Sequence, residues 1–182
     1  MRRSGGLAVR RTKGRISAAS RSPSPAVRLS VVFLLSCTPI TTRPDFRPDP
    51  RAQSVMLDAR PERVTAVLDS LVAAESLEVR RANVRDGYVE AAWYDTQAHR
   101  TRHHEREITN LAATVKIRFW ADPWVPGQTR LTTEPVYRPR YDPSRPERDL
   151  EVIVPKEHEG YKIAQRLVDK LKQRFGVPKA AQ

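Results

Sequence analysis

The sequence contains a single cysteine, Cys37, in 182 residues, so no intramolecular disulfide framework holds the fold. Apolar residues are also scarce, at 39% of the chain, and 15 prolines indicate that part of it is not packed. No internal repeat is visible. The length therefore predicts one domain with a tail.

Acidic residues are missing from the first 36 positions, which carry eight basic residues. These eight account for most of the net charge of +12, because the rest of the chain has 25 basic and 21 acidic residues. A nearly balanced surface argues against a nucleic-acid interface, which needs clustered basic residues. We expect no nucleic-acid partner, and a basic nucleic-acid-binding protein is the alternative only if the N-terminal tail survives in the mature chain.

The apolar run at residues 29–35 is seven residues long, and Arg28 precedes it directly. A membrane-spanning helix needs about 20 apolar residues, whereas this length and flank are typical of the hydrophobic region of a signal peptide. The next residues, 34–37 (Leu-Leu-Ser-Cys), resemble the lipobox of bacterial lipoproteins. The resemblance implies cleavage after Ser36 and acylation of the Cys37 thiol.

This resemblance also implies a location in the cell. The protein would be attached through the lipid on Cys37 to the cell envelope, and Thr38 after the cysteine implies the outer membrane, facing the periplasm. Residues 1–36 are then a signal peptide, over-extended if the start codon is assigned too far upstream, and are excluded from the fold. The alternative is that Cys37 lies by chance beside a buried apolar segment, against which the Pro-rich flanks argue.

Three further segments follow Ser36. Residues 37–53 are predicted to be a Pro-rich tether, since 38–53 contain four prolines and no apolar periodicity. In a polyproline II conformation sixteen residues would span roughly 50 Å. A single domain is predicted over residues 54–178, with a short tail at 179–182.

Apolar periodicity predicts a helix that begins at Pro61 and a second helix at 157–175, ended by Gly176. Alternation predicts strands, and Asp86-Gly87 predicts a type I′ hairpin. Val89, Ala91 and Trp93 are expected on one face, and Pro135 is expected to end a strand. The predicted strands are 55–57, 77–84, 88–95, 115–120, 129–134 and 150–154, with loops at 97–111 and 135–149.

The order β-α-β-β-β-β-α predicts an α+β fold: an antiparallel sheet of four to five strands with two helices packed on one face. In element order alone, this resembles the helix-grip, TBP-like domains of the lipoprotein subunit of the outer-membrane β-barrel assembly machine. The resemblance rests on no shared motif. It implies a domain that binds other envelope proteins.

Histidines provide the only metal-like pattern, at His99, His103 and His104. His99 and His103 would share a face of a helix, but the segment has the composition of a loop and lacks an HExxH motif. A solvated charged loop is the favoured interpretation, and we expect no metal or other cofactor. A metal-dependent hydrolase that uses these histidines is the alternative.

The sequence contains two candidate binding features, and the first is a pair of tryptophans. Val115, Ile117 and Phe119 are expected to face the core, so Trp120 would point to the opposite face and form an exposed patch with Trp124. The alternative is that a loop, such as 135–149, covers that face.

The loop 135–149 itself carries Arg138 and Arg140 beside Tyr141, which could bind an anionic group. Pairing of the loop's arginines with its own acidic residues is the alternative. No nucleophile triad, phosphate loop or carboxylate pair can be assigned. The sequence therefore favours a non-enzymatic, lipid-anchored envelope protein whose domain binds a protein or small ligand.

Overall fold

A computed structural model describes residues 43–178. The signal-peptide prediction, Cys37, the start of the tether and the predicted tail lie outside these residues. Among the described residues, no helix is long and apolar enough to cross a membrane. In chain order the elements are β1 (Gln53–Leu57), α1 (Pro61–Ala74), β2 (Val79–Asn83), β3 (Tyr88–Ala91), β4 (Trp93–Asp95), β5 (Arg100–Arg102), the 3₁₀ helix η1 (Glu105–Glu107), β6 (Thr114–Pro123), β7 (Thr129–Tyr137), α2 (Glu147–Leu150), β8 (Val152–Ile153) and α3 (Glu159–Phe175).

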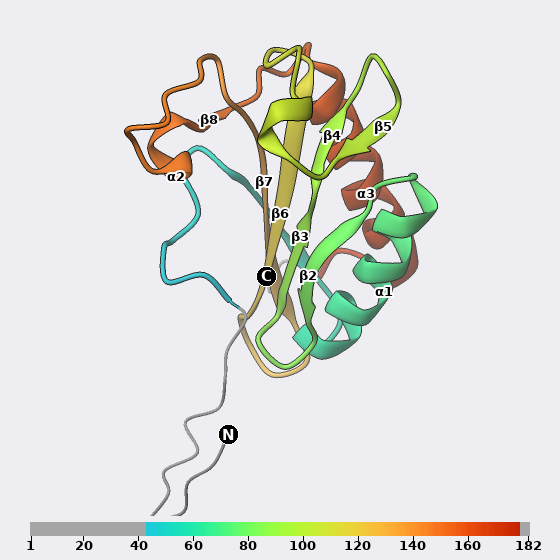
Figure 1. The fold of residues 1–182 in the computed structure, drawn as a ribbon. Helices are drawn as coiled ribbons and strands as arrows, with labels where there is room; N and C mark the ends of the chain where they lie inside the picture. Colours follow the sequence, from blue (N-terminus) through green and yellow to red (C-terminus); the bar gives the residue numbers. More distant parts are fainter. Residues whose placement is uncertain (1–42, 179–182) are drawn as a thin grey trace, which may run out of the picture. The chain divides into compact units, whose positions relative to one another are not determined.

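The strands form one antiparallel sheet in the order β1-β7-β6-β3-β2, with β4 between β5 and β6, and β8 beside β7 (Figure 1). The α+β class and the antiparallel sheet are confirmed. Within residues 43–178 the sheet has eight strands, more than the four to five predicted. The difference arises because the strand predicted at 88–95 is split in two, and because β5 forms inside a segment predicted as a loop.

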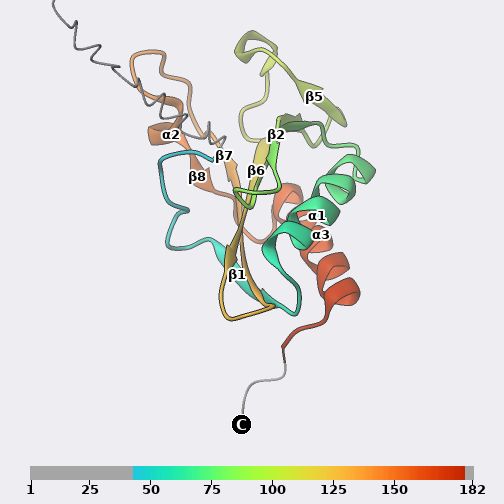
Figure 2. The ribbon, with the colours of Figure 1, turned by 90° about the horizontal axis from the view of Figure 1, so that it is seen from below.

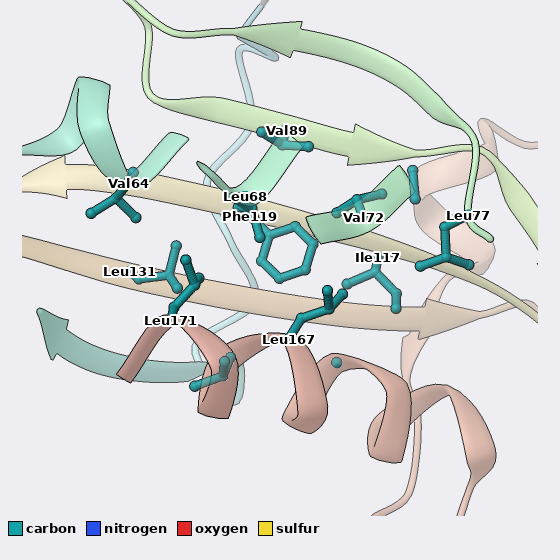
Figure 3. Packing of buried hydrophobic residues seen from close by; sticks show 14 of the residues in the cluster. Val64, Leu68, Val72, Leu77, Val89, Ile117, Phe119, Leu131, Leu167 and Leu171 are labelled. Carbon is teal, nitrogen blue, oxygen red and sulfur yellow. The ribbon is translucent and has the colours of Figure 1, made fainter. Parts of the chain in front are cut away.

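Helices α1 and α3 cover one face of the sheet, and Figure 2 shows them side by side. Proline stands at the start of α1, and Gly176 ends α3 with a φ of 76°, both as predicted. Between helices and sheet, Leu68, Leu167 and Phe119 lie in a continuous apolar cluster (Figure 3). This cluster is the core of the domain, so the two long helices lie where the sequence predicts them.

Strand alternation breaks at Ala92, between β3 and β4. The amide of Ala92 donates to the carbonyl of Glu78 at 2.8 Å, and the pairing with β6 shifts by one residue between Glu90, opposite Arg118, and Tyr94, opposite Val115. As a result Tyr94 follows Val89 and Ala91 into the core, whereas Trp93 turns to the opposite face. The prediction that Trp93 shares a face with Val89 and Ala91 is wrong, because one irregular residue inverts the alternation.

The hairpin at Asp86-Gly87 forms, but not as a type I′ turn. Asn83 pairs with Tyr88 across a four-residue connection, and Gly87 has a φ of 63°. Asp86 is not among the described residues of positive φ, which a type I′ turn requires at both central positions. The Asn83 carboxamide accepts hydrogen bonds from the amides of Arg85 and Asp86, which favours this longer turn.

Strand β7 continues through Pro135, which pairs with Ile117. The Pro135 carbonyl accepts a hydrogen bond from Val154, on the edge of β7 away from β6. A strand residue directs its nitrogen and its carbonyl to the same edge, so the missing N–H lies where β1 has ended and β8 has not yet begun. The prediction that Pro135 ends the strand is wrong, because no ladder bond is lost there.

Candidate functional site

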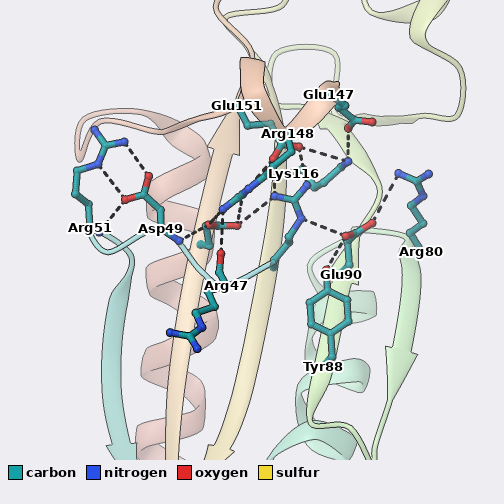
Figure 4. A network of polar contacts seen from close by, with 12 residues as sticks. Arg47, Asp49, Arg51, Arg80, Tyr88, Glu90, Lys116, Glu147, Arg148 and Glu151 are labelled. Atoms are coloured by element: carbon teal, nitrogen blue, oxygen red, sulfur yellow. Dashed lines mark hydrogen bonds and ion pairs between the residues drawn. The ribbon is translucent and has the colours of Figure 1, made fainter. Parts of the chain in front are cut away.

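The face of the sheet opposite the helices carries charged side chains instead of apolar ones. Glu90 comes from β3, Lys116 and Arg118 from β6, and Glu134 from β7, and all four are at most 4% exposed. On β6 these cations alternate with core residues, which is the pattern of a strand with one face in water. They are buried because two other segments cover this face: residues 43–52 and residues 138–151 (Figures 2 and 4).

Arg118 lies at the centre of the covered face. Its guanidinium donates to Glu151 at 2.7 and 2.6 Å, to Glu134 at 3.1 Å and to Glu90 at 3.2 Å. Arg148, from α2, donates to the same Glu134 at 2.6 and 2.8 Å. The planar fork of arginine suits such bidentate contacts, so this network joins three sheet strands to the covering segment.

Lys116 forms the second part of the network. Its ammonium contacts the Glu147 carboxylate and lies 4.4 Å from the centre of the Trp93 ring. Trp93 in turn donates its indole N–H to Glu147 at 2.9 Å, and the Arg138 guanidinium lies 4.8 Å from the same ring. Burial lowers the pKa of Lys116, and the charge of Glu147 opposes that shift.

Tyr88 and Glu90 form the third part. The Tyr88 hydroxyl donates to Glu90 at 2.6 Å. Burial alone would raise the pKa of Glu90, but the bond from Tyr88 and the charges of Lys116 and Arg118 outweigh it and lower the pKa. Burial, together with the bond to Glu90, raises the pKa of Tyr88. Glu90 is therefore ionised and Tyr88 neutral at neutral pH, so neither is suited to accept or release a proton there.

Residues 43–52 cover this network from outside. The Phe46 ring lies 4.4 Å from the Arg148 guanidinium carbon, 5.2 Å from that of Arg118, and 6.4 Å from the Trp120 ring, edge to face. The backbone amide of Asp49 donates to Glu134 at 2.8 Å. The boundary predicted at residue 54 is therefore too late, because the folded domain includes the second part of the predicted tether.

Trp120 points away from the core, as predicted, but it is 0% exposed. Phe46 and Tyr88 pack against its ring. The expectation of an exposed patch with Trp124 is wrong for Trp120. Phe46, in the segment predicted to be a tether, covers that face, so the cover does not come from residues 135–149 alone.

The charges on the covered face are matched within the chain. Each of its four glutamates contacts at least one cation, and the pKa values of Glu90 and Glu147 are lowered, away from neutrality. Burial lowers the pKa of Lys116, and its ammonium is held by Glu147. Burial of paired charges fixes geometry more than it adds stability. The arrangement is therefore a clamp that holds residues 43–52 and 138–151 on the sheet. The four glutamates are Glu90, Glu134, Glu147 and Glu151.

Open space also lies at the end of the sheet where β6 begins and β7 ends, here named the loop end (residues 103–112 and 138–141). A cavity of about 310 Å³ there is lined by Ile108, Leu111 and Tyr141 together with Arg106 and Arg138. A wider hollow beside it is lined by His103, His104, Arg106, Glu107 and Tyr141. The loop end thus combines apolar and cationic side chains around accessible space.

The predicted binding residues are partly brought together. Arg138 and Tyr141 line the same cavity, Tyr141 is 54% exposed, and Arg140 is exposed between them in the chain. Trp124 lies beyond the opposite end of β6 from this cavity. The structure therefore supports Arg138 and Tyr141 as neighbours and separates both from Trp124.

The three predicted histidines do not all line one hollow. His99, with a φ of 52°, lines a hollow with Glu75 and Tyr94, whereas His103 lies 3.5 Å from Glu78 and lines other hollows. Over residues 43–178, no group of three or more His, Cys, Asp or Glu side chains is placed to hold a metal ion. The described geometry therefore gives the hydrolase alternative no support.

Sequence reasoning missed the clamp altogether. A single charge in an apolar strand, Glu90, and a second one at Glu134 are signals that could have been noticed, because neighbouring strands offer Arg118 as a partner. Phe46 gave no signal, since an isolated aromatic in a Pro-rich stretch has no periodicity. A comparison with models of protein families finds no match, and neither does a search of curated proteins.

Proposed function

We propose that this chain is a lipid-anchored cell-envelope protein whose domain binds a partner without catalysing a reaction. The observation that carries the proposal is the contrast between the two surfaces described above. The charged face is covered by the chain's own segments, with its carboxylates paired, while the loop end has a cavity lined by both apolar and cationic side chains. A site that holds space but no activated acid, base or metal group favours binding.

The chemistry of the loop end indicates the kind of ligand. Ile108, Leu111 and Tyr141 offer apolar surface, and Arg106 and Arg138 place positive charge at the same cavity. Guanidinium groups bind carboxylates and phosphates in a bidentate manner. We therefore propose a ligand or protein segment that combines an apolar part with an anionic group.

The cellular location and the fold family are part of the same proposal. The lipobox-like residues before Thr38 support export and acylation of Cys37, with the outer membrane, facing the periplasm, as the destination. The neighbour order β1-β7-β6-β3-β2, with both long helices on one face, supports a helix-grip arrangement. Fold alone does not determine function, so this similarity adds only a preference for a binding role.

The anchor is tested with Cys37→Ser. The unaltered protein is expected in the detergent phase after phase separation, and its mature N-terminus is expected to carry acyl chains on Cys37 by intact mass. Cys37→Ser is expected in the aqueous phase or as the uncleaved precursor, while Thr38→Ser behaves like the unaltered chain. A mature protein that begins at Met1, or an unchanged distribution of Cys37→Ser, contradicts the anchor.

Binding at the loop end is tested by site-specific photocrosslinking in intact cells. A crosslinking amino acid at position 141 is expected to give a discrete adduct. The matched control is position 70, an exposed serine on the outer side of α1. Adducts from both positions alike, or from position 70 alone, contradict a binding site at the loop end.

A further inference from the structure

Exposed apolar side chains gather at the end of the sheet opposite the loop end. Of the five large apolar side chains exposed among residues 43–178, Trp124 (54%), Val125 (45%) and Val84 (40%) lie in the two turns at this end, and Val177 follows α3 beside Asp58. Residues 123–127 (Pro-Trp-Val-Pro-Gly) are all exposed. Solvated turns are ordinarily polar, so this composition needs an explanation.

The two turns are neighbours. The amide of Ala121 donates to the carbonyl of Gly87 at 2.7 Å, which places the β2–β3 turn against the end of β6. Figure 1 shows both turns together at the lower end of the sheet. We name residues 84–85 and 123–127 the anchor-end turns. Their exposed apolar side chains therefore belong to the same end of the sheet.

The chain enters the domain at the same tip. Arg43 donates to the carbonyl of Asp86 at 3.0 Å and to the Asp122 carboxylate at 2.7 Å, so it bridges the two turns. Cys37 precedes Arg43 by six residues. Even fully extended, six residues reach at most about 20 Å. If Cys37 carries lipid, the membrane surface therefore lies within that distance of the anchor-end turns.

We propose that the anchor-end turns contact the membrane surface to which Cys37 is attached. The inference rests on the proposed lipid anchor. Tryptophan favours the boundary between lipid headgroups and acyl chains, where Trp124 and the two valines would bury their exposed surface. Arg85 is exposed beside Val84, and the Arg130 guanidinium lies 5.5 Å from the Trp124 ring, so both can meet lipid phosphates.

This contact fixes the orientation of the domain. Strand β6 runs ten residues from Thr114 to Pro123, so the two ends of the sheet lie about 30 Å apart. With the anchor-end turns on the lipid, the cavity lined by Tyr141 faces away from the membrane. Anchoring and binding would then use opposite ends of one rigid hairpin.

Tryptophan fluorescence tests the proposal in the acylated full chain reconstituted into vesicles. The protein has three tryptophans; Trp93 and Trp120 are 7% and 0% exposed, so aqueous acrylamide reaches chiefly Trp124. On vesicles that contain brominated lipid, we expect Trp124 emission to be quenched by the bromine. We also expect acrylamide to quench Trp124 several-fold less on vesicles than in the same protein kept in detergent below the concentration at which micelles form.

A matched control moves the reporter to the other end. The double substitution Trp124→Phe with Tyr141→Trp transfers the exposed tryptophan to a position that is also 54% exposed. That variant is expected to stay fully accessible to acrylamide and unaffected by brominated lipid.

The outcomes separate the two proposals. Intact mass reports acylation, and a chain without acyl groups overturns the lipid anchor and this inference together. An acylated chain whose Trp124 stays accessible to acrylamide overturns the membrane contact alone. Shielding from acrylamide without bromine quenching indicates contact with protein, such as a second copy, and also overturns it.

Discussion

Arg118 donates from both terminal nitrogens to the two carboxylate oxygens of Glu151, at 2.7 and 2.6 Å. Arg118 belongs to β6 at the centre of the sheet, and Glu151 follows α2 in the covering segment. Both side chains are at most 4% exposed. This pair therefore joins the sheet directly to its cover, and its loss should be felt by the whole domain.

Arg118→Ala is expected to lower the free energy of unfolding by about 3–5 kcal/mol, because it leaves buried carboxylates without their central cation. Arg118→Lys keeps the charge but not the bidentate geometry, so we expect its free energy of unfolding to lie between those of the unaltered protein and of Arg118→Ala. Urea unfolding measures both. The control is Arg145→Ala, whose pair with Asp149 is exposed at 41% and 51% and should cost less than about 1 kcal/mol. Equal losses at the two sites would argue against the clamp.

Phe46→Ala removes the ring that covers Trp120. We expect a loss of about 1–3 kcal/mol from aromatic and cation–π contacts, and a shift of tryptophan emission to longer wavelength as Trp120 meets water. The measurement uses a Trp124→Phe background, which removes the exposed tryptophan. Phe175→Ala, at the end of α3, should lower stability without the emission shift. No shift in Phe46→Ala would mean that residues 43–52 do not lie on the sheet.

Gly160, at the start of α3, leaves no room for a side chain. A Cβ there would lie 2.6 Å from Cγ1 of Val115 and 3.0 Å from its Cβ. Gly160→Ala should therefore cost about 1–3 kcal/mol through overpacking. The same substitution should cost less in a Val115→Ala background, which a double-mutant cycle detects. An unchanged cost in that background would place the strain elsewhere.

Acid should weaken the domain. The bond from Arg51 lowers the pKa of Asp49 to about 2. For Glu90 and Glu147, burial is outweighed by hydrogen bonds and nearby cations, and the pKa of each is lowered. Groups with a lowered folded pKa contribute stability above their unfolded values of about 4, and that stability is lost as pH falls through the folded values.

Urea midpoints measured from pH 7 to pH 3 should therefore stay level at first and then fall below about pH 5. Glu90→Gln removes one of these titrations, so the fall should be shallower in that variant, although its stability at pH 7 is lower. A midpoint independent of pH over this range would contradict the lowered pKa values.

The helices and the long strands could be predicted from the sequence because each follows a single local period. Leu68 in α1 and Leu167 in α3 each belong to a series of apolar residues at helical spacing, and Ile117 and Phe119 alternate with polar residues on β6. Trp93 could not be placed, because the break at Ala92 leaves no mark in composition. The hairpin at Gly87 was predictable as a turn, but its type depended on the side chain of Asn83.

The charged face could not be predicted because its burial depends on segments distant in sequence. Lys116 and Arg118 alternate with apolar residues as solvent-facing side chains do, and only the contacts of Arg118 with Glu151 and Phe46 show otherwise. Phe46 lies 72 residues before Arg118, so no local window contains both. The burial of a strand by a segment distant in sequence therefore cannot be predicted from the periodicity of the strand itself.

Strand β1 has β7 as its described neighbour, with Gln53 beside Thr133. The first of the described strands to leave the ribosome therefore gains its hydrogen-bonded partner only after one of the last described strands is made, and such distant pairing slows folding. A chain that is exported in an unfolded form gains from this delay, since its sheet closes only when nearly the whole sequence is on the same side of the membrane. For the exported chain proposed above, this topology would postpone the native state until translocation is nearly complete.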